Sequence, residues 1–155
     1  MKKIKIQAKA ILSITVCVVL CIIFLACNQP GWELKDGVLT IFSDTGMDDW
    51  FSFLDEHGEA VSLIKTVKLK RGVTVVPLGV FECYEHLEEV FMADSVHTIE
   101  KYAFAHCDSL KTVHWSRGLK SIGLRAFKGT GLTEVKLPNG LKELRQRPIM
   151  RVFAA

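Results

Sequence analysis

The sequence predicts a β-rich solenoid of 22- or 23-residue repeats with short parallel strands, preceded by a β-hairpin cap. Two observations lead to this fold class. One spacing of apolar residues returns several times from residue 64 onward, and an Asp-Gly turn separates two apolar runs ahead of it. Repeats of this size bury their apolar faces only against their neighbours, so they form a surface more readily than a pocket. The pattern therefore favours a binding function.

The valines Val67, Val90, Val113 and Val135 mark successive repeats. Each valine begins a stretch in which every second residue is apolar. This alternation predicts a short strand with the valine facing the core and the residues between facing outward. Nine residues after each valine comes another apolar position, namely Val76, Ile99, Ile122 and Leu144. We expect the phenylalanines Phe81, Phe104 and Phe127 to fill the opposite side of each coil.

The segment ahead of the repeats predicts a hairpin, because Asp36-Gly37 lies between the apolar runs 32–34 and 38–42. Residues 43–46 are expected to turn the chain, and residues 47–54 form a short amphipathic stretch around Trp50. We therefore expect the hairpin cap over 32–62 and the repeats over 63–144. An incomplete or truncated repeat is expected over 145–155.

The amino-terminal region has the pattern of an export signal. Lysines at positions 2, 3, 5 and 9 precede an apolar run over 11–26 that ends in the small residue Ala26. We expect a signal peptide over 1–26 and a tether over 27–31. The run is short for a membrane span, which needs about 20 apolar residues, but an uncleaved signal anchor stays open. Both alternatives place the rest of the chain outside the cytoplasm.

Cys27 directly follows this run, and Phe24-Leu25-Ala26-Cys27 resembles the lipobox of bacterial lipoproteins. The resemblance implies that Cys27 is acylated and becomes the new amino terminus. The acyl chains would then hold the protein on the outer face of the membrane. The alternative is an ordinary cleavage site with an incidental cysteine; the protein would then be secreted.

The charge distribution gives no indication of a nucleic-acid partner, and we predict none. Four of the 20 basic residues lie in the expected signal, so sixteen basic and seventeen acidic residues remain, a net charge of −1. Residues 28–116 contain seven basic and fifteen acidic residues, whereas residues 117–155 contain nine and two. This asymmetry is either an ordinary solvated surface or an end-to-end polarity that orients a partner.

Asp44-Thr45-Gly46 matches the tripeptide that carries the catalytic aspartate of aspartic proteases. That mechanism needs two carboxylates that share a proton, which one copy could supply only through a homodimer. A solenoid is not the closed β fold that positions such a pair, so an aspartic-protease-like hydrolase is only an alternative function. We expect Asp44 to form a turn through its side chain, and we predict no enzyme activity and no catalytic residue.

Cys83 and Cys107 fall in neighbouring repeats, offset by one residue. A disulfide is possible in an oxidising compartment, but the offset favours two half-buried free thiols. His106 together with His86 or His114 could approach these thiols, yet the spacing matches no zinc pattern. The sequence therefore predicts no metal site and no cofactor.

The outward positions of the strands form the predicted ligand-binding face, which consists of Lys68, Glu89, Phe91, Thr112, His114, Glu134 and Lys136. Phe91 is the most informative of them, since an outward phenylalanine lacks a packing reason on a solenoid face and aromatic residues anchor interfaces. We expect Trp115 to lie near Phe91 and His114. Its register is inward, so a core position stays open.

The pattern Ile-x-x-x-Ala-Phe-x-x-Cys-x-x-Leu-x-x-Val-x-Leu-Pro resembles the BspA-like leucine-rich repeats of bacterial surface proteins, and residues 64–144 carry it. Tyr84 departs from it, at the cysteine position. The hairpin also resembles the segment that often precedes such repeats. The resemblance implies surface display, an extracellular protein or glycan ligand, and no known catalytic residues. Pro148-Ile149 replace the expected Ala-Phe, so a truncated, non-functional fragment of a longer surface protein is a further alternative.

Overall fold

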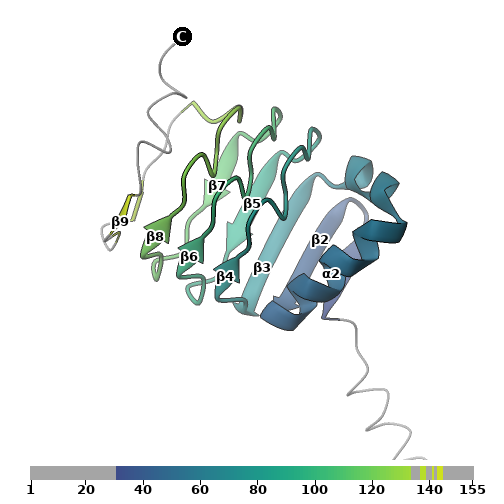
Figure 1. Cartoon of the computed structure of the whole chain (residues 1–155), viewed down its shortest axis with the longest axis horizontal. Helices are drawn as coiled ribbons and strands as arrows, with labels where there is room; N and C mark the ends of the chain where they lie inside the picture. The colour runs from purple at the N-terminus through teal and green to yellow at the C-terminus, as the bar shows by residue number, and fades with distance from the viewer. Residues whose placement is uncertain (1–30, 134–136, 139–140, 142, 145–155) are drawn as a thin grey trace, which may run out of the picture. The chain divides into compact units, whose positions relative to one another are not determined.

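The structure is a computed structural model that describes residues 31–133, 137–138, 141 and 143–144 (Figure 1). The expected signal, Cys27, Glu134, Lys136 and the expected incomplete repeat over 145–155 lie outside these residues. The elements are β1 (Trp32–Lys35), β2 (Val38–Ser43), α2 (Asp44–Glu56), the 3-10 helix η1 (Gly58–Leu63), β3 (Thr66–Gly72), β4 (Val75–Val76), β5 (Glu89–Met92), β6 (Thr98–Ile99), β7 (Thr112–His114), β8 (Ser121–Ile122) and β9 (Glu143–Leu144). None of the helices in the described ranges is long and apolar enough to cross a membrane.

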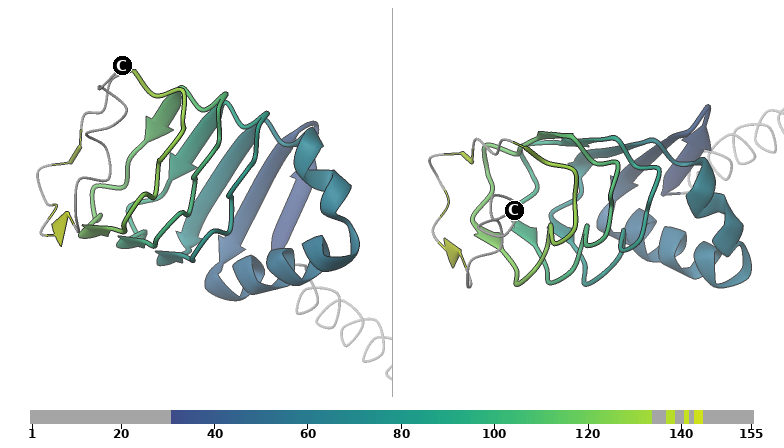
Figure 2. Two further views of the ribbon diagram at one scale, coloured as in Figure 1. Left: turned by 45° about the horizontal axis from the view of Figure 1, so that its top comes forward. Right: turned by 90° about the horizontal axis from the view of Figure 1, so that it is seen from above.

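The strands form two sheets, which lie on two sides of the repeats (Figure 2). The first has the order β1-β2-β3-β5-β7 and the second the order β4-β6-β8-β9. β1 and β2 form the expected antiparallel hairpin, with Lys35 opposite Val38. All other pairs are parallel, and Val67, Val90 and Val113 stand in register across β3, β5 and β7. The register confirms the parallel stacking that the repeat predicts.

The second sheet is a feature that sequence reasoning missed. Its strands β4, β6 and β8 coincide with the apolar positions Val76, Ile99 and Ile122, which pair in register. Each of these strands has two residues, which is too short for an alternation of apolar and polar residues to be visible. The nine-residue step therefore located the buried residues without revealing their conformation.

A column of three aromatic rings runs through the core. Phe81 stacks on Phe104 with ring centroids 5.1 Å apart, and Phe104 stacks on Phe127 at 5.2 Å. All three side chains are fully buried, which confirms that the phenylalanines fill the coils. The inward valines of β3 and β5 are buried as expected, whereas Val113 in β7 is half-buried. Each of these three repeats thus contributes one ring to a continuous core.

Two positions in the turn of each repeat have left-handed backbone conformation. The φ angles are 60° at Gly79, 57° at Tyr102 and 58° at Arg125, then 62° at Cys83, 58° at His106 and 70° at Gly129. Between these positions, backbone N–H groups of one turn donate to carbonyl groups of the next, as from Phe81 to Ala103 and from Phe104 to Ala126. This geometry is costly for residues with a side chain, and four of the six are not glycine.

Helix α2 replaces the turn that was expected at residues 43–46. Ser43 is the N-cap, and its Oγ accepts a hydrogen bond of 3.1 Å from the backbone N–H of Gly46. A serine in this role satisfies one of the free donors at the start of a helix, so the prediction of a turn was wrong. Gly46 is required because a Cβ there would collide with the backbone of Gly31.

Two polar contacts join α2 to the first repeat. The indole Nε1–H of Trp50 donates to the hydroxyl oxygen of Tyr84 at 3.0 Å, and both residues are buried. Tyr84 stands at the repeat position that Cys107 occupies one repeat later. At the start of the helix, the carboxylate of Asp44 accepts hydrogen bonds from Thr74 and Val75. The tyrosine that departs from the repeat pattern thus has a structural role.

Candidate functional site

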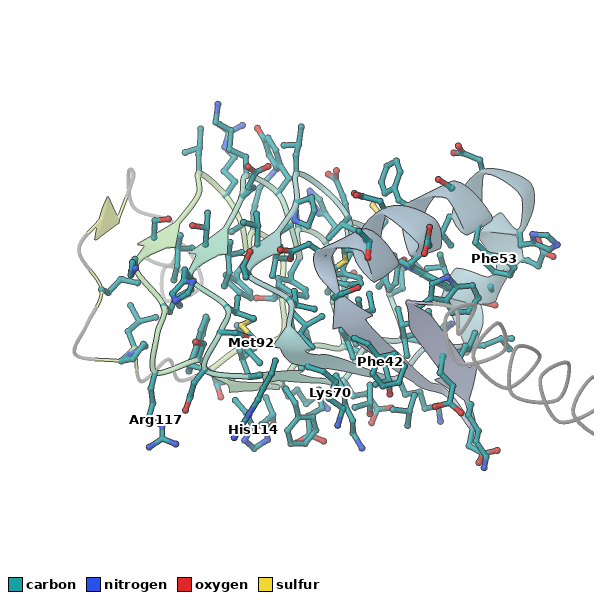
Figure 3. All side chains as sticks on the ribbon, turned by 90° about the horizontal axis from the view of Figure 1, so that it is seen from below. Phe42, Phe53, Lys70, Met92, His114 and Arg117 are labelled. Atoms are coloured by element: carbon teal, nitrogen blue, oxygen red, sulfur yellow. The ribbon has the colours of Figure 1, made fainter. Side chains whose placement is uncertain are left out.

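The outward sides of β3, β5 and β7 bring the described residues of the predicted ligand-binding face together. Thr66, Glu89 and Thr112 form one row across the three strands, and Lys68, Phe91 and His114 form the next. His114 and Lys70 are labelled on this side of the first sheet in Figure 3. We call Lys68, Glu89, Phe91 and His114 the outward cluster. Five of the seven predicted residues are therefore neighbours, and Glu134 and Lys136 fall outside the described residues.

The outward cluster is held by contacts among its own side chains. The rings of Phe91 and His114 stack with centroids 4.2 Å apart and an interplanar angle of 3°. Lys68 Nζ lies 5.7 Å from the centre of the Phe91 ring, and His114 Nε2 lies 2.8 Å from Glu89 Oε1. The expectation that Phe91 lacks a packing reason is therefore wrong, because side chains from both neighbouring strands cover its ring. The result is a preformed aromatic surface between a cation and a carboxylate.

Trp115 does not belong to this cluster. It is half-buried and packs edge-on against the core residue Phe127, with ring centroids 5.2 Å apart. The inward register is thus confirmed, and the expectation that Trp115 groups with Phe91 and His114 is wrong. A residue that sequence reasoning missed is Phe42, which is 45% exposed near the end of β2. The alternation along this strand buries Leu39 and Ile41 and therefore assigns Phe42 to the outward side. This alternation could have identified Phe42 from the sequence.

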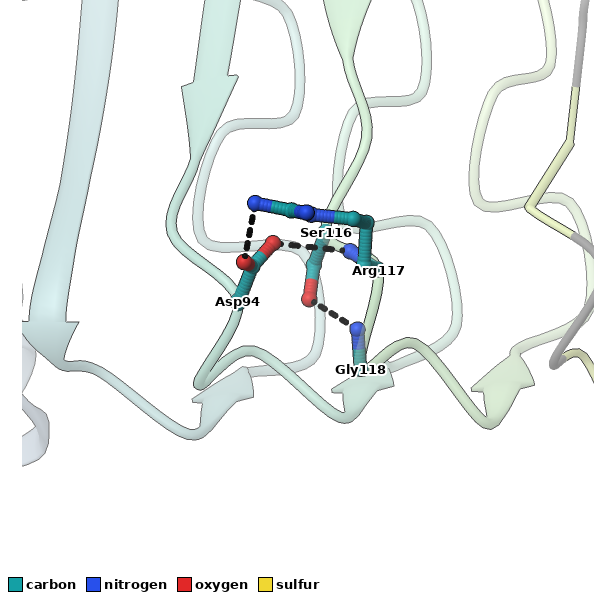
Figure 4. A network of polar contacts seen from close by, with 4 residues as sticks. All are labelled: Asp94, Ser116, Arg117 and Gly118. Atoms are coloured by element: carbon teal, nitrogen blue, oxygen red, sulfur yellow. Dashed lines mark hydrogen bonds and ion pairs between the residues drawn. The ribbon is translucent and has the colours of Figure 1, made fainter.

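A polar turn closes one end of this face between β5 and β7 (Figure 4). The backbone N–H of Arg117 donates to Asp94 at 3.1 Å, and the Arg117 guanidinium lies 3.0 Å from the same carboxylate. The hydrogen bond from the Arg117 backbone, helped by its guanidinium and by the charge of Arg71, holds the pKa of Asp94 below its ordinary value. The buried Ser116 accepts from the backbone N–H of Gly118 at 3.0 Å. These contacts set the separation of the strand ends.

Asp44, the residue of the protease-like tripeptide, makes structural contacts. Its two oxygens accept from the backbone N–H of Thr74 at 2.7 Å, from the Thr74 hydroxyl at 2.6 Å and from the backbone N–H of Val75 at 3.3 Å. Partial burial raises the pKa of Asp44, but these hydrogen bonds outweigh it, so the pKa lies below its ordinary value. A proton-sharing pair of carboxylates would instead raise the pKa of one member. The carboxylate covers donors at the edge of the second sheet, where β4 begins.

Asp44→Ala should lower the free energy of unfolding by about 1–2 kcal/mol at neutral pH, a range reduced for solvent screening at this exposed site. The lowered pKa means that ionised Asp44 stabilises the fold above the pKa of the unfolded chain, about 3.9. This contribution is lost as the pH falls through the lower pKa of the folded state. Urea unfolding at several pH values measures the difference between variant and wild type. A difference that is equally large at neutral pH and in acid would contradict this role.

The two described cysteines are free, with Cys83 exposed and Cys107 buried. The Cys107 thiol donates to the carbonyl oxygen of Phe81 at 3.1 Å, and burial raises the pKa of this thiol to about 12. The expectation of two half-buried thiols is thus wrong, because the one-residue offset places Cys83 at a left-handed surface position. Within the described ranges, no group of three or more His, Cys, Asp or Glu residues could hold a metal ion.

Comparisons with known proteins agree on the repeats. The family described as BspA type leucine rich repeat region matches residues 59–150 in six copies. A crystal structure of a leucine-rich repeat protein from Eubacterium ventriosum is similar, with 24% identity over 71% of this chain and 30% of that one and a TM-score of 0.56. The leucine-rich repeat protein of T. pallidum shows 21% identity over 71% of this chain and 48% of that one, with a TM-score of 0.49. The chain therefore spans less than half of the length of either, and no curated protein matches it.

Proposed function

Because the chain belongs to the BspA-type leucine-rich repeat family, we propose that it is an exported cell-surface binding module for an extracellular protein or glycan. The family suggests a protein-interaction module, and its members are commonly surface-associated. The proposal includes export from the cytoplasm, adhesion, and a solenoid that presents the outward strand face to the ligand. The positions Glu134 and Lys136 would extend this face by one repeat.

The outward cluster is the observation that carries the proposal. Aromatic residues flanked by charges are typical anchors of protein interfaces. Phe91 and His114 are already stacked, so binding costs little side-chain entropy. Lys68 and Glu89 supply one charge of each sign next to these rings, which would orient a ligand. An aspartic-protease function lacks comparable support, because the contacts of Asp44 are structural.

Phe91→Ala should weaken ligand binding at least tenfold, because truncating a central aromatic anchor commonly costs that much. The measurement compares full chains displayed on cells for binding to arrays of extracellular matrix proteins and glycans. His114→Ala is the second variant, and Leu63→Ala is the matched control. Leu63 is 63% exposed and lies in η1, outside the sheets. Circular dichroism verifies the fold of each variant. Binding that Phe91→Ala and His114→Ala leave unchanged would overturn the proposed face.

Cys27 is the proposed lipidation site that attaches the module to the membrane, and it lies outside the described residues. The wild-type chain should incorporate a labelled fatty acid, and Cys27→Ser should abolish this incorporation because it removes the thiol that is acylated. The matched control is Cys21→Ser, a cysteine within the apolar run that no acyl transfer would use. If the wild-type chain incorporates no labelled fatty acid and stays in the membrane fraction at its full length, the segment is an uncleaved signal anchor and the lipid proposal fails.

A further inference from the structure

A second surface lies between α2 and the turn that follows β4, away from the outward cluster. It is a groove of about 350 Å³, lined by Met47, Asp48, Phe51, Ser52, Pro77, Leu78, Val80 and Glu100. This volume is at the low end of the range for ligand pockets, roughly 300–1,000 Å³, so the groove can accept a few side chains. Its floor is apolar, since Met47 and Val80 are almost completely buried.

One large apolar side chain is exposed on each side of this groove. Phe51 on α2 is 52% exposed and Leu78 on the turn is 59% exposed. Neither belongs to the first sheet, so the proposed outward face does not account for them. Apolar side chains that converge on one groove, instead of lying scattered, are typical of an interaction site.

Hydrogen bonds hold the backbone on both sides of the groove in place before any partner binds. Asp44 holds the start of α2 against the start of β4 through the hydrogen bonds to Thr74 and Val75. On the other side, Glu100 Oε2 accepts a hydrogen bond of 3.0 Å from the backbone N–H of Leu78. The groove therefore has little conformational entropy to lose on binding.

The charge of the groove decides which partner fits. Among the described residues that line it, the ionisable ones are the carboxylic acids Asp48 and Glu100, and none is basic. An acidic partner would be repelled. A second copy that docks with the same groove would bring four carboxylates together, and the described lining residues supply no basic side chain to compensate them. We propose that this groove binds a basic peptide segment with an apolar anchor, so that aliphatic side chains enter between Phe51 and Leu78 while lysine or arginine pairs with the carboxylates.

The test uses the full chain and a short synthetic peptide in which lysines flank two leucines. Fluorescence anisotropy should show saturable binding that salt weakens and that is at least tenfold tighter than for the peptide with glutamates in place of lysines. Phe51→Ala and Asp48→Lys should each reduce binding at least fivefold. Ser52→Trp, at an exposed position, should block the groove without removing an apolar contact. Leu63→Ala and Asp108→Lys are the matched controls and should have no effect.

Three results would overturn the proposal that the groove binds a basic peptide. These are the absence of saturable binding at millimolar peptide, equal binding of the glutamate peptide, and insensitivity to Phe51→Ala together with Ser52→Trp. A dimer in sedimentation that Phe51→Ala dissociates would assign the groove to a second copy and likewise refute the peptide proposal. Phe91→Ala should leave peptide binding unchanged, because it lies in the first sheet. The experiments can therefore refute the proposal for the outward face and the proposal for the groove independently of each other.

Discussion

Phe104→Ala should lower the free energy of unfolding by about 3–5 kcal/mol, the range measured for removal of a buried phenylalanine side chain. Phe104 is the middle ring of the column, with Phe81 on one side at 5.1 Å and Phe127 on the other at 5.2 Å. Removing it leaves a cavity and exposes a ring face in each neighbouring repeat. Since each repeat is stabilised by its neighbours, the loss affects the interfaces on both sides.

Urea unfolding followed by circular dichroism measures this effect. Phe104→Leu should cost much less, because it retains most of the apolar volume. Phe51→Ala is the matched control and should change stability by less than about 0.5 kcal/mol, since half of its side chain is already in contact with water. A loss below about 1 kcal/mol for Phe104→Ala would show that the column is not the centre of the core.

Tyr84→Phe should lower the free energy of unfolding by about 1–3 kcal/mol, although it removes only one oxygen atom. The lost hydroxyl is the partner of the Trp50 indole N–H, which the substitution leaves buried without an acceptor. Burial raises the pKa of Tyr84, so the hydroxyl stays protonated over the whole range in which the protein is handled. The effect is therefore the same at neutral pH and in acid, whereas that of Asp44→Ala is lost in acid.

A double-mutant cycle with Trp50→Phe separates this hydrogen bond from the packing of the two rings. Each single variant already loses the shared hydrogen bond, so the two single losses should sum to more than the loss in the double variant. The apolar volume that Trp50→Phe removes is lost in the single and in the double variant alike, and it cancels in the cycle. Urea unfolding gives the four free energies, and the tryptophan fluorescence, to which Trp32, Trp50 and Trp115 contribute, should shift in Tyr84→Phe. Strict additivity of the two single variants would mean that the hydrogen bond contributes nothing to the attachment of α2.

Part of the candidate site could be predicted because the strand period and the repeat period together define it. The alternation around Val67, Val90 and Val113 assigns Lys68, Phe91 and His114 to the outward side, and the 23-residue spacing puts them side by side. The spacing does not reveal that the Phe91 ring stacks on His114. That contact depends on side-chain rotamers and on the separation of adjacent strands, which no pattern of residue types encodes.

The repeat period is enough to establish the parallel sheet, its register and the column of phenylalanines, because identical units must stack in the same way. The contacts between unlike parts of the chain needed the folded structure. Trp50 meets Tyr84 across 34 residues, and Asp44 meets Thr74 across 30, each through the orientation of a helix that occurs once. The groove beside Phe51 and Leu78 arises from that same helix. A unique element has no second copy in the sequence from which its placement could be inferred.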